Sequence, residues 1–369
     1  MERHHPRCHD PSDRRVHERH RRAVERRPHG SRRGRLVSGA SAAVERPNHP
    51  ALEVGSLSLS LDRRHEQRPL LDGISLSVAA GETVGLVGES GSGKSLTSRA
   101  ALGLFPLKST RSGSVKVDGV EVLGAPAGVI ADIRRHRAAM VFQDPRASIN
   151  PVRKLGDFIT ESSRVAGAKA SESESRAVRL LDEVGIREPE QAMQRYPQEF
   201  SGGMLQRVMI AAALMCAPKL LLADEATTAL DVTTQAEVVS LLKRMQRLHG
   251  TGTLLVTHNL ELAASSCDRV YVMYAGRVVE SATSDALFDD PQHPYTRGLL
   301  ASSPSVRGPR VPIHPIPGRP VALADAGEGC AFRDRCPKAG QACHQAVPPL
   351  APSGRTVAAC FFPGEVAAS

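Results

Sequence analysis

One short stretch of the chain carries residue types that could hold a chain of phosphates. It fits the pattern G-x-x-x-x-G-K-[ST] and consists of Gly88, Glu89, Ser90, Gly91, Ser92, Gly93, Lys94 and Ser95. The glycines let backbone N–H groups turn toward the phosphates. Lys94 is long enough to reach the β- and γ-phosphates, and Ser95 offers a hydroxyl to Mg²⁺. The alternative is a Gly/Ser-rich loop whose lysine is only a surface charge, which a full match to the pattern disfavours.

The flanking residues give this loop the context that it needs. The apolar run 83–87 predicts a buried strand, and residues 96–102 predict a helix. A helix that begins at the loop adds the positive end of its dipole to the anion site. Strand, glycine-rich loop and helix together predict a nucleotide phosphate site.

A pair of acidic residues is the second candidate for chemistry. The apolar run 219–223 predicts a buried strand, and it leads into Asp224 and Glu225. Asp224 can hold Mg²⁺ directly or through water, and Glu225 can orient or deprotonate the water that attacks a γ-phosphate. Acid pairs after apolar runs are common, so this signal gains its weight from the phosphate loop about 130 residues earlier.

A third feature is the sequence Ser201, Gly202, Gly203 at the start of a predicted helix that runs through Met215. A serine and two glycines at a helix start can cradle an anion, and the alternative is an ordinary N-cap. By itself, this feature does not distinguish an anion site from an ordinary N-cap.

Alternating strands and helices are predicted to position these residues. Apolar patterns predict strands at 54–61, 70–78, 114–120, 139–145, 219–223, 253–258, 270–273 and 277–280, and helices at 96–102, 200–215 and 232–248. The polar, helix-like stretch from about 144 to 200 is interpreted as a helical insertion. Strands that alternate with helices predict an α/β fold with a parallel core.

Composition predicts a globular protein without a membrane span. Hydrophobic residues make up 41% of the 369 residues and charged residues 24%. No apolar run approaches the ~18 residues that cross a bilayer, and no apolar signal-peptide core is found near the start. The chain is therefore expected to stay in the cytoplasm.

The net charge of +9 is concentrated in residues 1–50. This segment holds 13 Arg, no Lys and six acidic residues, which leaves only +2 for the rest of the chain. Because it has few apolar residues, the segment is predicted to be a disordered tail. A solvated tail, or a start site placed too far upstream, is favoured over a tail that touches anionic lipid or nucleic acid. No nucleic-acid partner is expected.

These motifs, in this order, resemble the ATP-binding-cassette (ABC) ATPases over about residues 52–285. The stretch 200–204 resembles the family's signature, usually Leu-Ser-Gly-Gly-Gln. Gln143 stands at the Q-loop, the stretch 229–231 resembles the D-loop, and His258 resembles the switch histidine. Two positions depart from the family. The aromatic residue that stacks on adenine in the family falls close to Leu61, where this sequence has no aromatic residue, and Ala226 stands where proline is usual.

The resemblance implies a fold and a set of roles. The fold is a P-loop NTPase core at 51–285 with an antiparallel β subdomain and an inserted α-helical subdomain at about 144–215, followed by a small cysteine-containing extension at 286–369. Two such domains sandwich ATP between the phosphate loop of one and the signature of the other. The implied catalytic residues are Lys94, Gln143, Glu225 and His258, the implied Mg²⁺ ligands are Ser95, Gln143 and Asp224, and the implied ATP contacts across the dimer are Ser201, Gly202, Gly203 and Asp231.

The end of the chain resembles the C-terminal extension of oligopeptide/dipeptide importer ATPases. The resemblance rests on residues 291–296, residues 316–318 and four late cysteines, which are Cys330, Cys336, Cys343 and Cys360. Four thiolates suit Zn²⁺ or an iron–sulfur cluster, and unliganded thiols are the third option. The resemblance implies a [4Fe–4S] cluster, with Zn²⁺ as the alternative.

The implied function is an ATP-binding and ATP-hydrolysing subunit that powers import of peptides or similar small solutes. Its expected partners are two permease subunits, a second ATPase subunit (a copy or a paralogue) and an extracytoplasmic substrate-binding protein. Its expected place is the cytoplasmic face of the inner membrane. The alternative is a soluble ABC ATPase that acts on DNA or ribosomes. The absence of a long coiled-coil insertion and the near-neutral main part of the chain disfavour that alternative.

Overall fold

The computed structural model describes residues 49–63, 66–226, 232–302 and 314–364. The predicted tail at 1–50 therefore lies almost entirely outside the described residues, and so does Asp231 of the predicted D-loop.

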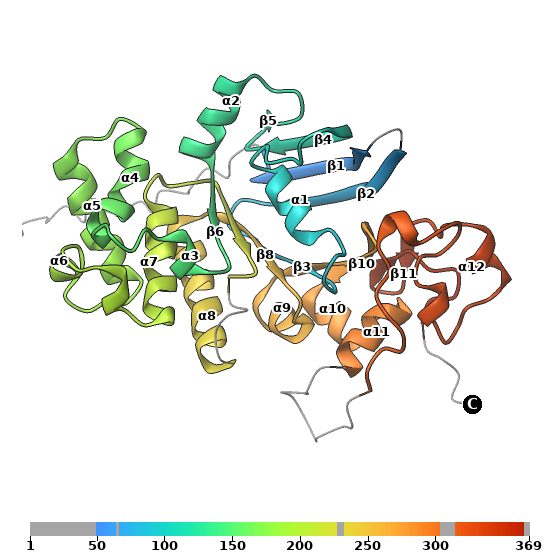
Figure 1. Ribbon diagram of the computed structural model, residues 1–369. Coiled ribbons are helices and arrows are strands. Elements are labelled where there is room, and N and C mark those ends of the chain that lie inside the picture. The colour runs from blue at the N-terminus through green and yellow to red at the C-terminus, as the bar shows by residue number, and fades with distance from the viewer. Residues whose placement is uncertain (1–48, 64–65, 227–231, 303–313, 365–369) are drawn as a thin grey trace, which may run out of the picture. The chain divides into compact units, whose positions relative to one another are not determined.

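The larger of two sheets has eight strands in the order β11-β12-β10-β9-β3-β8-β7-β6. These strands are β11 (Ala351–Ser353), β12 (Thr356–Ala358), β10 (Arg277–Thr283), β9 (Arg269–Tyr274), β3 (Thr83–Val87), β8 (Gly252–Thr257), β7 (Leu220–Asp224) and β6 (Ala138–Val141). The strands from β9 to β6 are parallel, whereas β10, β12 and β11 pair antiparallel. The predicted parallel α/β core is confirmed (Figure 1).

The smaller sheet is antiparallel and has the order β2-β1-β4-β5. Its strands are β1 (Leu52–Arg63), β2 (Glu66–Val78), β4 (Ser109–Val117) and β5 (Val120–Glu121). Its buried residues share one hydrophobic core with Leu220 and Leu222 of β7, whereas Leu221 and Ala223 belong to the core on the other face of the large sheet. This alternation follows from the two-residue period of a strand.

Every described element between β6 and β7 is helical. The elements are α3 (Pro145–Ser148), α4 (Leu155–Val165), α5 (Ala170–Glu183), α6 (Pro189–Ala192), the 3₁₀ turn η2 (Pro197–Glu199) and α7 (Gly202–Leu214). Apolar stripes on these helices, including Ile159, Leu181 and Leu205, are buried in a common core. The remaining helices of this part connect strands of the large sheet. Helix α1 (Lys94–Ala100) follows β3, and α2 (Ala127–Asp132) with the π-helical turn η1 (Ile133–Arg137) precedes β6. Strand β8 lies in the sequence between α8 (Val232–His249) and α9 (Leu260–Ser266).

The last part of the chain joins the large sheet. It contains α10 (Ser284–Asp289), α11 (Pro294–Ala301), the 3₁₀ turns η3 (Leu323–Asp325) and η4 (Arg333–Arg335), and α12 (Gln341–Gln345). Strand β12 pairs with β10, with Ala358 opposite Glu280. The fully buried Glu280 carboxylate accepts hydrogen bonds from the backbone N–H groups of Gln292 and His293, at 2.7 and 2.9 Å. Residues 314–364 are thus built onto the large sheet. Among the described residues, no helix has the length and apolar character to cross a membrane.

Candidate nucleotide site

The topology brings several of the predicted catalytic and metal-binding residues to one edge of the large sheet. Strands β3, β8, β7 and β6 are parallel neighbours, so their carboxyl ends lie together. Val87 is opposite Thr257, Asp224 is opposite Val256, and Val141 is opposite Ala223. The phosphate loop, the acid pair, His258 and Gln143 all follow these strand ends, which is the usual place for ligands of open α/β sheets.

The phosphate loop has a backbone that only glycine adopts easily. Gly91 and Gly93 have φ angles of +81° and +100°. A Cβ atom on Gly93 would lie 2.5 Å from Leu71 Cδ2, so a side chain is excluded on two grounds. Ser92 is buried, and its Oγ has no hydrogen-bond partner among the described residues. An unsatisfied hydroxyl at the start of α1 fits a loop that is built to hold an anion.

Lys94 lies inside the loop. Its ammonium donates hydrogen bonds to the carbonyls of Gly88 and Glu89 at 2.7 and 2.9 Å, and its side chain is buried. Burial lowers the pKa of Lys94, and the nearby carboxylates of Glu225, Asp224 and Glu89 oppose that shift. The ammonium is thus a buried donor beside the loop, placed to meet negative phosphate oxygens.

Ser95 and Asp224 meet directly. The Ser95 hydroxyl donates to Asp224 Oδ1 at 2.7 Å, and Arg99 lies 3.4 Å from the other carboxylate oxygen. The Asp224 side chain is buried. A hydroxyl and a carboxylate side by side are the hard oxygen donors that Mg²⁺ prefers, so this pair fits the expected metal. Gln143, the third expected ligand, lies two residues beyond β6 and is exposed.

Glu225 and His258 directly follow the ends of the neighbouring strands β7 and β8. Glu225 has a φ of +49°, and its N–H donates to the Val256 carbonyl of β8 at 3.1 Å. A left-handed glutamate is strained, and such strain gathers at functional sites. His258 follows β8 directly and is exposed, while Asn259 caps α9 by accepting from the Leu262 N–H at 3.0 Å. The backbones of both residues are therefore positioned by rigid elements at the sheet edge.

Ser201, Gly202 and Gly203 do not join this group. The Ser201 hydroxyl caps α7 by accepting from the Met204 N–H at 3.3 Å. Helix α7 lies well apart from α1 in Figure 1, so the signature of this chain does not reach its own phosphate loop. Asp231 lies outside the described residues.

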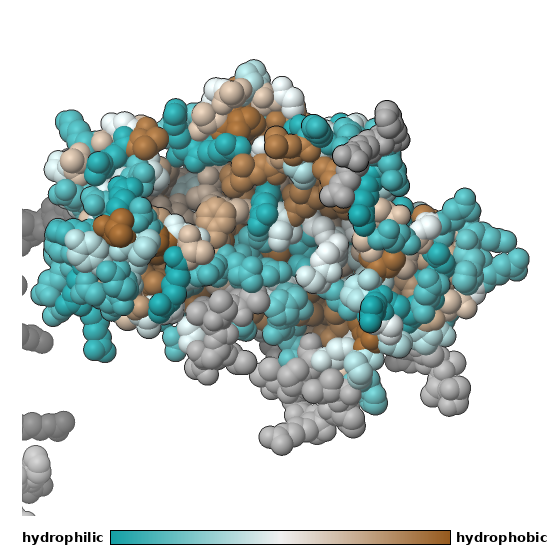
Figure 2. Space-filling view, in the orientation of Figure 1, coloured by the Kyte–Doolittle hydropathy of each residue, from teal (hydrophilic) through white to brown (hydrophobic). Residues whose placement is uncertain are grey.

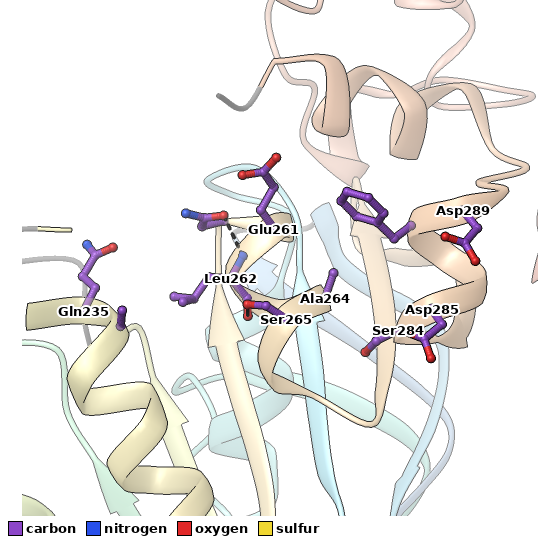
Figure 3. Close-up of a pocket in the computed structure, with 11 residues that line it drawn as sticks. Gln235, Glu261, Leu262, Ala264, Ser265, Ser284, Asp285 and Asp289 are labelled. Atoms are coloured by element: carbon purple, nitrogen blue, oxygen red, sulfur yellow. Dashed lines mark hydrogen bonds between the residues drawn. The ribbon is translucent and has the colours of Figure 1, made fainter. Parts of the chain in front are cut away.

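A different cavity lies between α8, α9 and α10 (Figure 3). Its volume is about 260 Å³, and Gln235, Glu261, Asp285 and Asp289 are among its lining side chains. Its lining includes three carboxylates but no lysine or arginine. It therefore does not suit a polyphosphate, although it is well formed.

The four late cysteines are free thiols gathered in one module. The N–H of Cys330 donates to the Cys343 carbonyl at 2.8 Å. Burial raises the pKa of Cys330 and Cys360, and raises that of Cys336 to about 11, with the neighbouring cysteines adding to each shift. In the part of the chain that the structure describes, however, no group of three or more His, Cys, Asp or Glu side chains could hold a metal ion. The expected cluster is not supported by this geometry.

Two residues at the site were missed by the sequence analysis. The Glu89 carboxylate accepts two hydrogen bonds from Arg335, at 2.6 and 3.0 Å, and the Glu89 N–H donates to the Tyr295 hydroxyl at 2.8 Å. Tyr295 lies in the stretch 291–296 that carried the resemblance, and Arg335 precedes Cys336. Nothing in the sequence connects either residue with the phosphate loop.

The fold and the phosphate site define an ABC ATPase. The family model "ABC transporter" matches residues 71–228. Among solved structures, a dimeric ATP-binding cassette in a post-hydrolysis state with ADP and Pi is 25% identical, with a TM-score of 0.56, over 63% of this chain and 98% of that one. The cbiO1 subunit of the Clostridium perfringens ABC transporter complex cbiONQ is 26% identical, with a TM-score of 0.57, over 65% and 90%.

The chain belongs, more narrowly, to the oligopeptide/dipeptide transport ATP-binding proteins. The model "Oligopeptide/dipeptide transporter, C-terminal region" matches residues 279–343. The oligopeptide transport ATP-binding protein AppD of Bacillus subtilis is 45% identical over 84% of this chain and 96% of its own length. OppD of Salmonella typhimurium is 40% identical over 89% and 98%. The resemblance seen in the sequence is confirmed, and the chain is an ATPase of the transporter-coupled class.

Proposed function

We propose that this chain supplies the energy for importing peptides, or similar small solutes, by binding and hydrolysing ATP at the edge of its large sheet. The observation that carries the proposal is the direct contact of Ser95 with Asp224 beside the buried Lys94. The names of the relatives, which concern oligopeptide transport, indicate the cargo class.

The proposed roles are those that the family resemblance implies, and the position of these residues at one edge of the large sheet supports them. Lys94 and the N–H groups of the loop neutralise and orient the phosphates. Ser95, Asp224 and Gln143 hold Mg²⁺, which supplies charge neutralisation to the phosphates when bound. Glu225 orients the attacking water and accepts its proton, and His258 contacts the γ-phosphate from the adjacent strand. Positioning and charge account for most of the rate in phosphoryl transfer, and these residues supply both.

A second ATPase subunit completes the site. Support comes from the distance between α7 and α1 within one chain (Figure 1) and from the dimeric state of a similar cassette. In the proposed pair, Ser201, Gly202, Gly203 and Asp231 of one subunit face the phosphate loop of the other. The second subunit is either a copy of this chain or a paralogue.

The proposed membrane partner docks beside Gln143. Phe142, the residue before Gln143, is 44% exposed, and two further apolar side chains, Val152 and Leu107, are 79% and 90% exposed. Figure 2 shows hydrophobic side chains gathered over the region of α1 and α2 and toward α3. The proposed partners are two permease subunits and an extracytoplasmic binding protein, and the proposed place of the chain is the cytoplasmic face of the inner membrane.

The cysteines carry a separate proposal. A [4Fe–4S] cluster, or Zn²⁺ as the alternative, would draw together four thiols, of which Cys330, Cys336 and Cys360 have pKa values raised by burial and by neighbouring cysteines. The test is iron, sulfide and zinc content per chain after anaerobic purification. Metal below one-tenth of an equivalent per chain would leave these residues as structural thiols.

Capture of the partners tests the transport proposal. Tagged Glu225→Gln, trapped with MgATP, is purified from detergent-solubilised membranes beside the surface control Glu53→Gln. Two multispanning proteins and a second ATPase are expected with the trapped variant. Recovery of DNA or ribosomes in their place would favour the soluble ABC ATPase and refute the import function.

A further inference from the structure

The phosphate loop is tied to the C-terminal part of the chain by a partly buried ion pair. Arg335 Nη1 and Nη2 donate to the two Glu89 carboxylate oxygens at 2.6 and 3.0 Å. The side chains of Arg335 and Glu89 are only 6% and 24% exposed. Because a planar guanidinium meets both oxygens, the pair fixes an orientation as well as a charge.

The two side chains that hold Glu89, Arg335 and Tyr295, are themselves held in place by their neighbours. Arg335 Nε donates to the Pro317 carbonyl at 2.8 Å, and its guanidinium lies 5.7 and 5.8 Å from the ring centroids of Tyr274 and Phe332. Tyr295 is fully buried, and its ring centroid lies 4.7 Å from that of Tyr274. The C-terminal part therefore offers Glu89 a preformed donor, the Arg335 guanidinium, and a preformed acceptor, the Tyr295 hydroxyl, rather than two flexible side chains.

Every polar group of Glu89 is engaged in this arrangement. Its carboxylate is held by Arg335, its N–H donates to Tyr295, and its carbonyl accepts from Lys94 at 2.9 Å. Glu89 is also one of the three carboxylates whose charge acts on Lys94. Without Arg335, this carboxylate would be an unneutralised negative charge in the loop that binds phosphates.

We propose that Arg335 and Tyr295 are positioning residues of the nucleotide site, through which the C-terminal part of the chain sets the affinity for MgATP. Arg335 neutralises and orients Glu89, and Tyr295 fixes the backbone at the first half of the loop. Neither residue touches the phosphates. The inference rests on the proposed role of residues 88–95 as the phosphate site.

The test measures MgATP binding by the full-length chain, together with KM and kcat for ATP hydrolysis. Arg335→Gln is expected to raise Kd and KM about tenfold, because the unneutralised Glu89 carboxylate then repels the phosphates, with kcat changed less than about twofold. Adding Glu89→Gln to this variant removes the unneutralised charge and is expected to restore Kd to within about threefold of the wild type. Arg355→Gln is the matched control, because Arg355 belongs to the same C-terminal part and pairs with the exposed Asp289, away from the phosphate loop.

The outcomes separate the possible failures. If the wild type does not bind MgATP, the proposed function fails and this inference fails with it. If the wild type binds and Arg335→Gln binds equally well, or if the double variant is no better than the single one, the positioning role alone is refuted. Should Arg335→Gln not fold, Tyr295→Phe, which removes one hydroxyl, is expected to raise Kd a few-fold, and an unchanged Kd refutes the role.

Discussion

Replacement of Glu225 by Gln isolates the proposed general base. The change keeps the size of the side chain, and the strained backbone is held by the N–H bond to Val256, so the fold should persist. A positioned base contributes about 10²- to 10⁴-fold, so the barrier to hydrolysis should rise by about 3–5 kcal/mol. MgATP binding should be equal or tighter, because one of the three carboxylates near Lys94 loses its charge.

The assay pairs phosphate release with equilibrium MgATP binding in the same preparation. Glu53→Gln on β1 is the control for a glutamate lost from an exposed position. Turnover within about twofold of the wild type would remove Glu225 from its role. Loss of both turnover and MgATP binding would show that Glu225 maintains the structure of the phosphate loop rather than orienting the attacking water.

Three further predictions follow from local geometry. Gly93→Ala should abolish MgATP binding, because its φ of +100° and the 2.5 Å approach to Leu71 Cδ2 leave no room for a methyl group; binding at wild-type affinity would contradict this. Glu280→Ala should lower the free energy of unfolding in urea by about 3 kcal/mol, because it leaves two buried N–H groups unpaired, and a loss under ~0.5 kcal/mol would contradict it. Burial lowers the pKa of His293 to about 4, so its contribution of about 3 kcal/mol is present above pH 6.5 and is lost as the pH falls toward 4. His293→Asn should flatten this part of the pH dependence, and an unchanged slope would exclude His293 as its source.

The sequence by itself determined the fold class and the order of the chemical residues. Three local signals were enough for this, since strand and loop propensities depend on neighbouring residues. They are the glycine pattern at 88–95, the buried strand that ends on Asp224 and the strand before His258. Predicted element positions at 219–223 and 253–258 differ from β7 and β8 by one residue at each end. The family resemblance came from the same local motifs.

Only the tertiary structure decided which distant residues meet. The pairing of β12 with β10, the contact of Tyr295 with Glu89 and the ion pair of Glu89 with Arg335 join residues that are far apart along the chain. A single sequence holds no periodicity or spacing that reports such contacts, because they arise from how the final segment packs on the sheet. The same holds for the four cysteines, whose number and clustering near the end of the chain suggested ligands, while their packing shows no metal-binding group among the described residues. The residues of the phosphate loop and of the strand ends are recognisable from their neighbours in the sequence, whereas the partners of Glu89 depend on the packing of the whole fold.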